Sequence, residues 1–281
     1  MQIGAYHAPA TIAEAVRLLA ELPDAVPLAG GMTLLPVIRQ RLAAPDAVID
    51  LGRIAGLDTI RIEDGSVHEG TRQPNRLVIG AGTTHATVAD SQLVATVLPA
   101  LARLAGDIGD PAVRARGTIG GSLANNDPAA DYPAAALALD AWNVTDRRVI
   151  PAADFFQGFF QTALMPGEIV TAASLAIPAC AGYAKLRSQA SRFPVCGVFV
   201  SRFADGPRVA VTGAGSQGVF RATVLEQALT ADWSPAAARA ARLPEAGLLS
   251  DANAGPRYRA HLVSVLAARA IAGIMDTAPA A

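Results

Sequence analysis

The order of helix and strand patterns in the first fifty residues constrains the fold of this chain most. Residues 11–14 form a capping-box pattern, and leucines follow it at helical spacing. A short apolar run, residues 26–29, ends at the pair Gly30-Gly31, after which residues 32–42 repeat the helical spacing and residues 47–51 resemble a buried strand. Helix, strand, glycine turn, helix and strand in this order predict a small α/β unit.

A second unit begins near residue 57. We predict strands at residues 58–62 and 77–81, followed by a helix that extends through Leu104. Residues 106–133 then place many glycines and prolines between apolar elements, which is typical of a functional loop. From about residue 177 the pattern changes to strand-like runs followed by alanine-rich helices.

The chain has 281 residues, which is more than one ordinary core needs. We therefore expect residues 1–177 to form one domain, with subdomains of about 1–55 and 56–177. Residues 178–281 are expected to form a smaller second domain. The predicted fold class is α+β.

Composition excludes several classes of function. A hydrophobic fraction of 52% with 17% charged residues indicates a globular protein rather than a disordered one. The formal net charge is -1 and no run of lysine or arginine occurs, so we expect no nucleic-acid partner. No uncharged apolar stretch of about 18 residues and no signal-peptide pattern occur, so we expect a cytoplasmic protein without a membrane span.

The two cysteines, Cys180 and Cys196, match neither a redox pair nor a zinc or iron–sulfur ligand set. They are expected to be buried or free thiols, and the chain cannot hold a four-cysteine cluster unaided. No Ser-His-Asp or Cys-His arrangement can be read, and the histidines lack partners at ligand spacing. We accordingly predict no catalytic residue and no metal site in this chain.

Residues 213–218 spell GxGxxG after a strand at residues 208–212, the pattern of a dinucleotide-binding turn. A Rossmann unit also needs a second parallel strand with an acidic residue about twenty positions on. Here helical patterns at 223–229 and 236–242 follow instead. We interpret the segment as a turn only, with nicotinamide binding as the alternative.

Two other glycine turns are flanked by serine or threonine: Gly30-Gly31 before Thr33, and Gly120-Gly121 between Thr118 and Ser122. Two such turns can hold a diphosphate with backbone donors and no lysine. Glycine pairs also occur in ordinary tight turns, and spacing alone leaves both interpretations open.

Several motifs, in order along almost the whole chain, resemble the FAD-binding medium subunit of molybdenum hydroxylases, the family of carbon monoxide dehydrogenase and xanthine dehydrogenase flavoproteins. The motifs are residues 28–36 (LAGGMTLLP), 48–54 (VIDLGRI), 116–124 (RGTIGGSLA), 127–131 (DPAAD), 183–186 (YAKL) and 258–262 (YRAHL). The resemblance implies a two-subdomain FAD-binding domain, similar to the PCMH and vanillyl-alcohol-oxidase type, followed by a C-terminal flavoprotein domain.

What the resemblance implies for the cofactor is a non-covalent FAD whose diphosphate is held by the two glycine turns. Ile108 and Ile169 would line the flavin pocket. Asp131 would form a hydrogen bond with the cofactor. Lys185 would lie near the isoalloxazine, and Phe193 would lie over that ring. For Lys185 an exposed surface position stays open, and for Asp131 a helix cap. The cofactor-binding residues implied are Leu28, Ala29, Gly30, Gly31, Met32, Thr33, Leu34, Leu35, Ile108, Thr118, Ile119, Gly120, Gly121, Ser122, Asp131, Ile169, Lys185 and Phe193.

Two departures from the family's pattern stand out. Met32 replaces the usual His, Gln or Asn, which removes one side-chain contact to the cofactor, and Asn125-Asn126 replace the usual Ala or His. Neither removes a glycine, so the resemblance still implies FAD.

The resemblance also implies partners: a small [2Fe-2S] iron–sulfur subunit and a large molybdopterin subunit, in a heterotrimer or its dimer. This chain would then pass electrons from the iron–sulfur clusters through FAD to an external acceptor. The alternatives are a nicotinamide-dependent oxidoreductase that uses residues 213–218, and a scaffold subunit without a cofactor.

Overall fold

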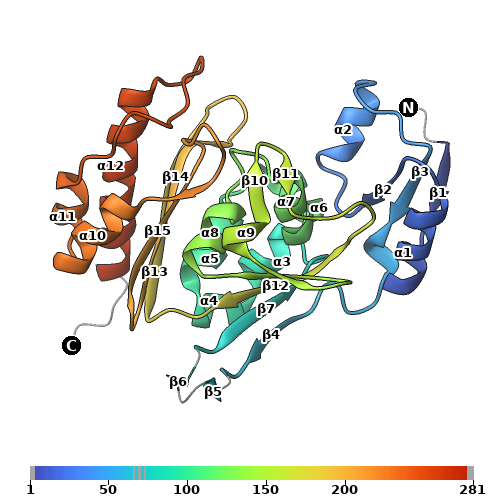
Figure 1. The fold of residues 1–281 in the computed structure, drawn as a ribbon, viewed down its shortest axis with the longest axis horizontal. Helices are drawn as coiled ribbons and strands as arrows, with labels where there is room; N and C mark the ends of the chain where they lie inside the picture. The colour runs from blue at the N-terminus through green and yellow to red at the C-terminus, as the bar shows by residue number, and fades with distance from the viewer. Residues whose placement is uncertain (1–3, 66, 69–70, 73, 277–281) are drawn as a thin grey trace.

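Three larger sheets follow one another across the molecule, as the computed structural model shows for residues 4–65, 67–68, 71–72 and 74–276 (Figure 1). The first is a parallel sheet in the order β1-β3-β2. Its elements are β1 (Ala5–His7), α1 (Ile12–Glu21), β2 (Ala25–Leu28), α2 (Leu34–Arg39) and β3 (Ala47–Asp50), with a 3-10 turn at Leu51–Arg53. The predicted α/β unit is confirmed.

The capping box predicted at the start of α1 is present. The Thr11 hydroxyl accepts a hydrogen bond from the Glu14 N–H at 3.2 Å, and the Glu14 carboxylate accepts one from the Ala10 N–H at 3.0 Å. Because the residues that form these two hydrogen bonds are close together in the sequence, the sequence alone was sufficient to locate the start of the helix.

The second sheet is antiparallel, in the order β4-β7-β12-β8-β9. Its strands are β4 (Ile60–Glu63), β7 (Arg76–Gly80), β8 (Trp142–Thr145), β9 (Val149–Pro151) and β12 (Val170–Ala176). Leu77 and Ile79 of β7 point into the core formed with the helices on one face. Two short hairpins complete this part: β5 (Val67–His68) with β6 (Thr71–Arg72), and β10 (Phe156–Gly158) with β11 (Gln161–Thr162).

The helices against this sheet differ from those predicted. The helix expected through Leu104 is three helices, because Ser91 caps a new one and Pro99 begins another. The expected loop at residues 106–133 contains two helices that start after the caps Asp110 and Thr118. The helices are α3 (His85–Asp90), α4 (Gln92–Val97), α5 (Pro99–Gly106), α6 (Pro111–Arg116), α7 (Ile119–Asn125), α8 (Tyr132–Ala138) and α9 (Ala152–Phe155).

The third sheet is antiparallel, in the order β13-β14-β15-β16, and lies between two layers of helices (Figure 1). Phe199 and Ala210 pack with α5 and α8 in the core of the second sheet, whereas Val198, Val200 and Val211 pack against the C-terminal helices. One sheet thus serves two cores. The elements are β13 (Cys180–Arg187), β14 (Pro194–Phe203), β15 (Gly206–Thr212), β16 (Phe220–Arg221), α10 (Thr223–Ala231), α11 (Pro235–Ala240) and α12 (Pro256–Met275).

The GxGxxG segment connects β15 to β16, and β15 pairs antiparallel with both of its neighbours. The predicted lack of a second parallel strand is therefore correct for the part of the chain that the structure describes. The predicted boundary near residue 178 falls between β12 and β13.

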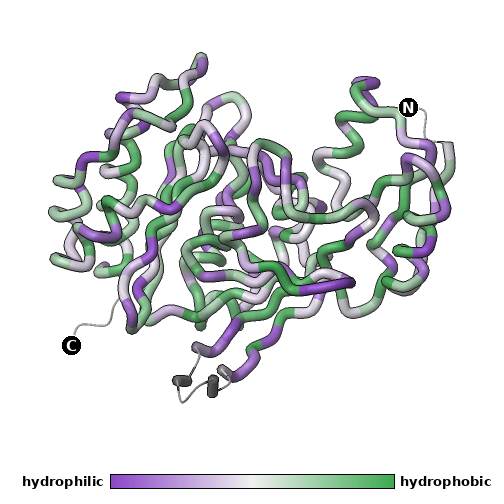
Figure 2. The backbone as a smooth tube through the Cα atoms, in the orientation of Figure 1, coloured by the Kyte–Doolittle hydropathy of each residue, from purple (hydrophilic) through white to green (hydrophobic). Residues whose placement is uncertain are grey.

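Hydropathy follows these layers. Figure 2 shows hydrophilic residues at the lower ends of β4 and β7, where Glu63 and Arg76 pair in register. Within the described residues, no helix is long and apolar enough to span a membrane.

Candidate functional site

The two glycine turns lie in contact, although about ninety residues separate them in the sequence. A Cβ placed on Gly30 would lie 2.0 Å from the carbonyl oxygen of Arg116 and 2.8 Å from the Cα of Gly117. A Cβ on Gly121 would lie 3.8 Å from the Cβ of Ala29. The first turn follows β2 and the second begins α7, so the contact joins the first sheet to the helices of the second (Figure 1).

The first turn presents a row of free backbone donors. The N–H groups of residues 30–34 have no acceptor among the described residues. Gly31 has a φ of +74°, a conformation that favours glycine, and the side chains of Leu28 and Leu35 pack against it. Successive free N–H groups before a helix are the arrangement that binds phosphate oxygens.

The second turn is bonded within the chain instead. The Ile119 N–H donates to Thr83 O at 3.0 Å, the Gly120 N–H to Ala81 O at 2.9 Å, and the Gly121 N–H to the Thr118 hydroxyl at 3.1 Å. In the second turn only the Thr118 N–H has no acceptor among the described residues, so the row of free donors belongs to the first turn.

The two glycines of the second turn, Gly120 and Gly121, are surrounded differently. A Cβ on Gly120 would lie 2.4 Å from the Cβ of Ala81, so the protein's own packing requires glycine there. At Gly121 the tightest contact is the Thr118 hydroxyl at 3.0 Å, and the open side faces Ala29 of the first turn. The packing against Ala81 is therefore sufficient to exclude a side chain at Gly120.

Residues 81–85 brace the second turn from behind. Thr84 and Thr118 form a β-bridge, and the His85 N–H donates to Gly117 O at 2.9 Å. The His85 ring is buried against Tyr132, with centroids 5.4 Å apart. Burial, with a smaller contribution from Arg114, lowers the pKa of His85 to about 4, so the ring is neutral at physiological pH.

A buried polar cluster of three side chains lies beside the loop that follows the second turn. The Asp131 Oδ1 accepts hydrogen bonds from the Tyr183 hydroxyl at 2.6 Å and from the Lys185 ammonium at 2.8 Å. Lys185 also donates to the carbonyl oxygen of Asp107 at 2.8 Å. The side chains of Lys185 and Asp131 are 2% and 5% exposed, which excludes a solvated lysine.

Asp131 stands at the N-cap position of α8, but its side chain makes no capping bond to the helix. Burial raises the pKa of Asp131, and Lys185 and Tyr183 act in the opposite direction. Burial also raises the pKa of Tyr183 well above its ordinary value, so the phenol remains a donor. Of the 23 lysine and arginine residues in the chain, Lys185 is the single lysine.

The other predicted site residues divide into two groups. Ile108 follows Asp107 directly and is half-buried, and Phe193 is 46% exposed where β13 turns into β14. Phe193 lines a cavity of about 170 Å³ together with Pro128 and Ala129, which lead to Asp131. Ile108, Asp131, Lys185 and Phe193 thus lie around one region.

Ile169 lies elsewhere. Its side chain is 3% exposed and packs with Ala15, Ile49 and Leu57 in the core of the first sheet. Its N–H donates to the Asp146 carboxylate at 2.7 Å. Met32 is 37% exposed beside the free donors of the first turn.

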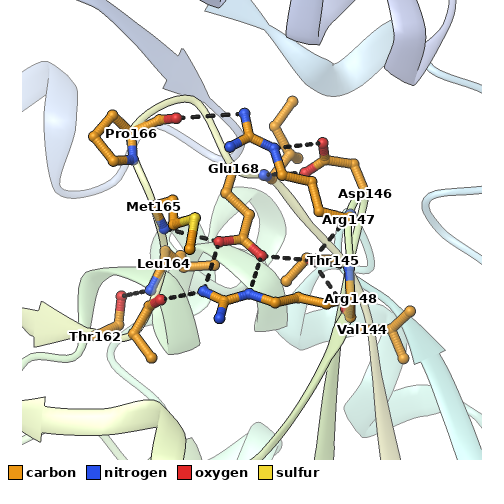
Figure 3. A network of polar contacts seen from close by, with 12 residues as sticks. Val144, Thr145, Asp146, Arg147, Arg148, Thr162, Leu164, Met165, Pro166 and Glu168 are labelled. Atoms are coloured by element: carbon orange, nitrogen blue, oxygen red, sulfur yellow. Dashed lines mark hydrogen bonds and ion pairs between the residues drawn. The ribbon is translucent and has the colours of Figure 1, made fainter.

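A network of polar contacts holds the segment before Ile169 (Figure 3). The buried Glu168 carboxylate accepts bonds from Arg148 at 3.0 Å, from the Thr145 hydroxyl at 2.8 Å and from the Met165 N–H at 2.8 Å. Arg148 is the main cause that lowers the pKa of Glu168 to about 2. The network fixes the loop to the β8–β9 hairpin.

Sequence reasoning missed Tyr183 and the Glu168 network. Tyr183 could have been found, because it is two residues before Lys185 on a strand and therefore faces the same side. Lys185 is the single lysine of the sequence, which was a second reason to examine the residues that flank it. Nothing in the sequence indicated the Glu168 network, whose members join two distant loops.

Metal ligands are not grouped in the described part of the chain, where no three His, Cys, Asp or Glu side chains converge. The side chain of His68 lies outside the described residues. Cys196 is buried, which raises the pKa of its thiol to about 12, and Cys180 is half-buried.

Several known proteins are similar to this chain in sequence. Residues 1–180 match the family described as FAD binding domain in molybdopterin dehydrogenase. The carbon monoxide dehydrogenase medium chain of Afipia carboxidovorans is 35% identical over 95% of this chain and 94% of that protein. The nicotine 6-hydroxylase medium subunit of Paenarthrobacter nicotinovorans is 37% identical over 95% of each chain.

Solved structures agree with the sequence relatives. A chain of carbon monoxide dehydrogenase from Hydrogenophaga pseudoflava superimposes with a TM-score of 0.83 at 34% identity, over 98% of both chains. A chain of quinoline 2-oxidoreductase from Pseudomonas putida 86 gives a TM-score of 0.84 at 26% identity, over 98% of this chain and 99% of that one. The predicted fold class and the predicted cofactor, FAD, are confirmed. This chain belongs to the FAD-binding medium subunits of the molybdenum hydroxylases.

Proposed function

We propose that this chain is the electron-exit subunit of its complex, passing electrons from iron–sulfur clusters on a partner through FAD to an external acceptor. The observation that carries the proposal is the contact between the two glycine turns, with a row of free N–H donors at residues 30–34 on one side of it. When bound, FAD can exchange electrons one at a time or two together. The chain itself offers binding and orientation, with no acid or base catalyst.

The diphosphate is proposed to lie between the two turns. The free N–H groups from Gly30 to Leu34 donate to its oxygens, as the row before α2 allows. Gly121 leaves the space open opposite Ala29. The proposed diphosphate-binding set is Leu28, Ala29, Gly30, Gly31, Met32, Thr33, Leu34, Leu35, Thr118, Ile119, Gly120, Gly121 and Ser122.

The isoalloxazine is proposed to lie near Lys185, with Ile108 and Phe193 as apolar neighbours and Asp131 as a polar one. A lysine ammonium held by a buried carboxylate provides a fixed positive charge, and such a charge favours the anionic form of a reduced ring. Ile169, fixed by Asp146 and the Glu168 network, completes the proposed set.

We infer partners from the same family membership. The relatives' names, medium chain and medium subunit, describe parts of larger assemblies. A small [2Fe-2S] subunit and a large molybdopterin subunit are proposed here, in a heterotrimer or its dimer. The cytoplasmic location and the division at residues 1–177 and 178–281 stay predictions.

The absorption spectrum of the purified chain tests the proposal. Flavin bands, with about one FAD released per chain by acid, are expected for a non-covalent cofactor. NAD affinity without flavin bands would favour the nicotinamide alternative, and neither signal would favour a scaffold. The antiparallel pairing around residues 213–218 argues against the nicotinamide alternative.

A further inference from the structure

The loop that carries Asp131 is held from the C-terminal side of the molecule. The Thr212 hydroxyl lies 2.6 Å from the carbonyl oxygen of Ala130 and 3.2 Å from that of Pro128. The Gly213 N–H donates to Pro128 O at 2.9 Å. We call these two donors the Thr212–Gly213 clamp.

Thr212 of the clamp and Lys185, which pairs with Asp131, lie in one row across the third sheet. Lys185 on β13 pairs with Gly197 on β14, and Gly197 pairs with Thr212 on β15, so all three face the same side. Gly197 keeps the row open, since a Cβ there would lie 2.5 Å from the Tyr183 hydroxyl and 2.9 Å from the Thr212 methyl. Lys185 therefore meets the Asp131 side chain, and Thr212 meets the backbone before it.

The clamp is itself fixed from behind by Arg259, which is 1% exposed. Its guanidinium donates to the carbonyl oxygens of Gly213 and Val195 and forms an ion pair with Asp251 at 2.7 Å. Gly213 has a φ of +75°, and a Cβ there would lie 2.6 Å from Pro194 O. The start of the GxGxxG segment is thus held by contacts with the chain's own carbonyl groups.

The other end of the Asp131 loop has its own support. Asp127 accepts bonds from the N–H groups of Ala129 and Ala130, at 2.8 Å and 2.9 Å. The carbonyl groups of Pro128 and Ala130, in contrast, point toward Thr212. The direction of these carbonyls sets the path of the backbone into Asp131.

We propose that Thr212 is a positioning residue of the FAD site: its hydroxyl and the Gly213 N–H orient residues 128–130 so that the Asp131 carboxylate meets Lys185 and Tyr183. The inference rests on the proposed function, because it assigns Thr212 to the site built around Lys185. It gives the C-terminal domain an indirect part in cofactor binding, through a hydroxyl bonded to the backbone before Asp131.

The test compares Thr212→Val, Thr212→Ser and Asp131→Asn in the full chain. Valine keeps the shape of threonine but loses the hydroxyl, so FAD should dissociate about tenfold more readily, the effect of roughly one hydrogen bond. The flavin midpoint potential should shift in the same direction as in Asp131→Asn, by less. Thr212→Ser should restore both values, and adding Thr212→Val to Asp131→Asn should change neither further.

Ser201→Ala is the matched control. The Ser201 hydroxyl is also buried and donates to a carbonyl oxygen across the same interface, that of Ala138 at 2.6 Å, but away from the Asp131 loop. It should lower stability without changing FAD affinity or potential. If Thr212→Val fails to fold, Thr212→Ala is measured in the same way.

Three results overturn the inference: Thr212→Val behaving like Ser201→Ala, serine failing to restore the site, or the valine effect persisting in Asp131→Asn. A wild-type chain without FAD would instead contradict the proposed function, so the two failures are distinguishable. Weaker FAD binding that serine restores and that disappears without Asp131 supports the positioning role.

Discussion

Two adjacent residues, Gly120 and Gly121, are under different structural constraints. Gly120 packs under Ala81 and Gly121 faces Ala29 across the contact of the two turns, although both read as one motif. The motif therefore records two constraints, one on packing and, in the proposed placement of the diphosphate, one on ligand space.

Gly121→Val should remove most FAD from the chain. The larger side chain fills the space opposite Ala29, so a diphosphate there loses at least two charge-assisted hydrogen bonds. Each contributes about 1.5–3 kcal/mol, so binding should weaken by about a hundredfold or more. The measurement is FAD per chain after gel filtration.

The matched control for that change is Gly106→Val at the end of α5, where the nearest atom to a Cβ is the Ala89 Cβ at 3.7 Å. It should retain FAD. In the assembled complex, Gly121→Val should leave substrate reduction of the iron–sulfur clusters intact and stop reduction of the acceptor. Full FAD content in both variants would contradict the placement of the diphosphate.

Lys185→Met should destabilise the chain strongly. It leaves Asp131 buried without its cation, a change that costs about 3–5 kcal/mol in comparable pairs. Urea unfolding of both proteins measures the difference. Arg17→Met breaks an exposed pair with Glu21 and should cost less than about 1 kcal/mol. Equal effects of the two substitutions would show that the Lys185 pair is not buried in solution.

At the scale of elements, the sequence predicted those helices and strands that depend on neighbouring residues and missed those that depend on contacts distant in the sequence. The first helix and the strands at residues 47–51, 77–81 and 208–212 were predicted to within two residues, because caps and apolar runs are local signals. Helix α7 was missed because its two glycines oppose helix formation, and contacts with Ala81 override that preference. The Asp131–Lys185 contact was not predicted: the resemblance implied only that each residue lies near the cofactor, and no local pattern joins residues so far apart.

Glu168→Gln should flatten the pH dependence of stability. The folded pKa of Glu168, about 2, lies below its ordinary value of 4.5, so the carboxylate stabilises the fold above pH 4.5 and this contribution disappears as the pH falls toward 2. Near neutral pH the variant should be less stable by about 1.5–3 kcal/mol, the effect of lost bonds to a charged group.

Melting temperatures between pH 3 and pH 7, about the range over which such a carboxylate titrates, test this expectation. The difference between wild type and variant should narrow at the acidic end. Glu63→Gln, in an exposed pair with Arg61, is the control and should show little difference at any pH. A constant gap across the range would mean that Glu168 does not contribute as a carboxylate.

At the scale of the whole molecule, the third sheet binds the parts together. Its alternating residues enter the core of the second sheet on one face and the C-terminal core on the other. The Thr212–Gly213 clamp crosses the same interface. The C-terminal part is therefore packed as a continuation of the FAD-binding part rather than as an appended module.

The native chain should co-purify with two partners, a small [2Fe-2S] protein and a large molybdopterin protein. The similar proteins are named medium chain and medium subunit, parts of larger assemblies, and the proposed partners would supply the metal centres. Metal analysis and mass spectrometry of the native complex test this. A chain that oxidised an organic substrate alone, without molybdenum, would contradict it.

The single lysine gives this protein an unusual handle. A protease that cuts after lysine has one site in the unfolded chain and releases residues 1–185 and 186–281. In the folded chain that side chain is 2% exposed and lies in a strand of the third sheet, so cleavage must wait for the sheet to open. The yield of two bands on a gel therefore reports opening at the proposed cofactor site, and added FAD should slow cleavage in proportion to the occupancy that the site reaches.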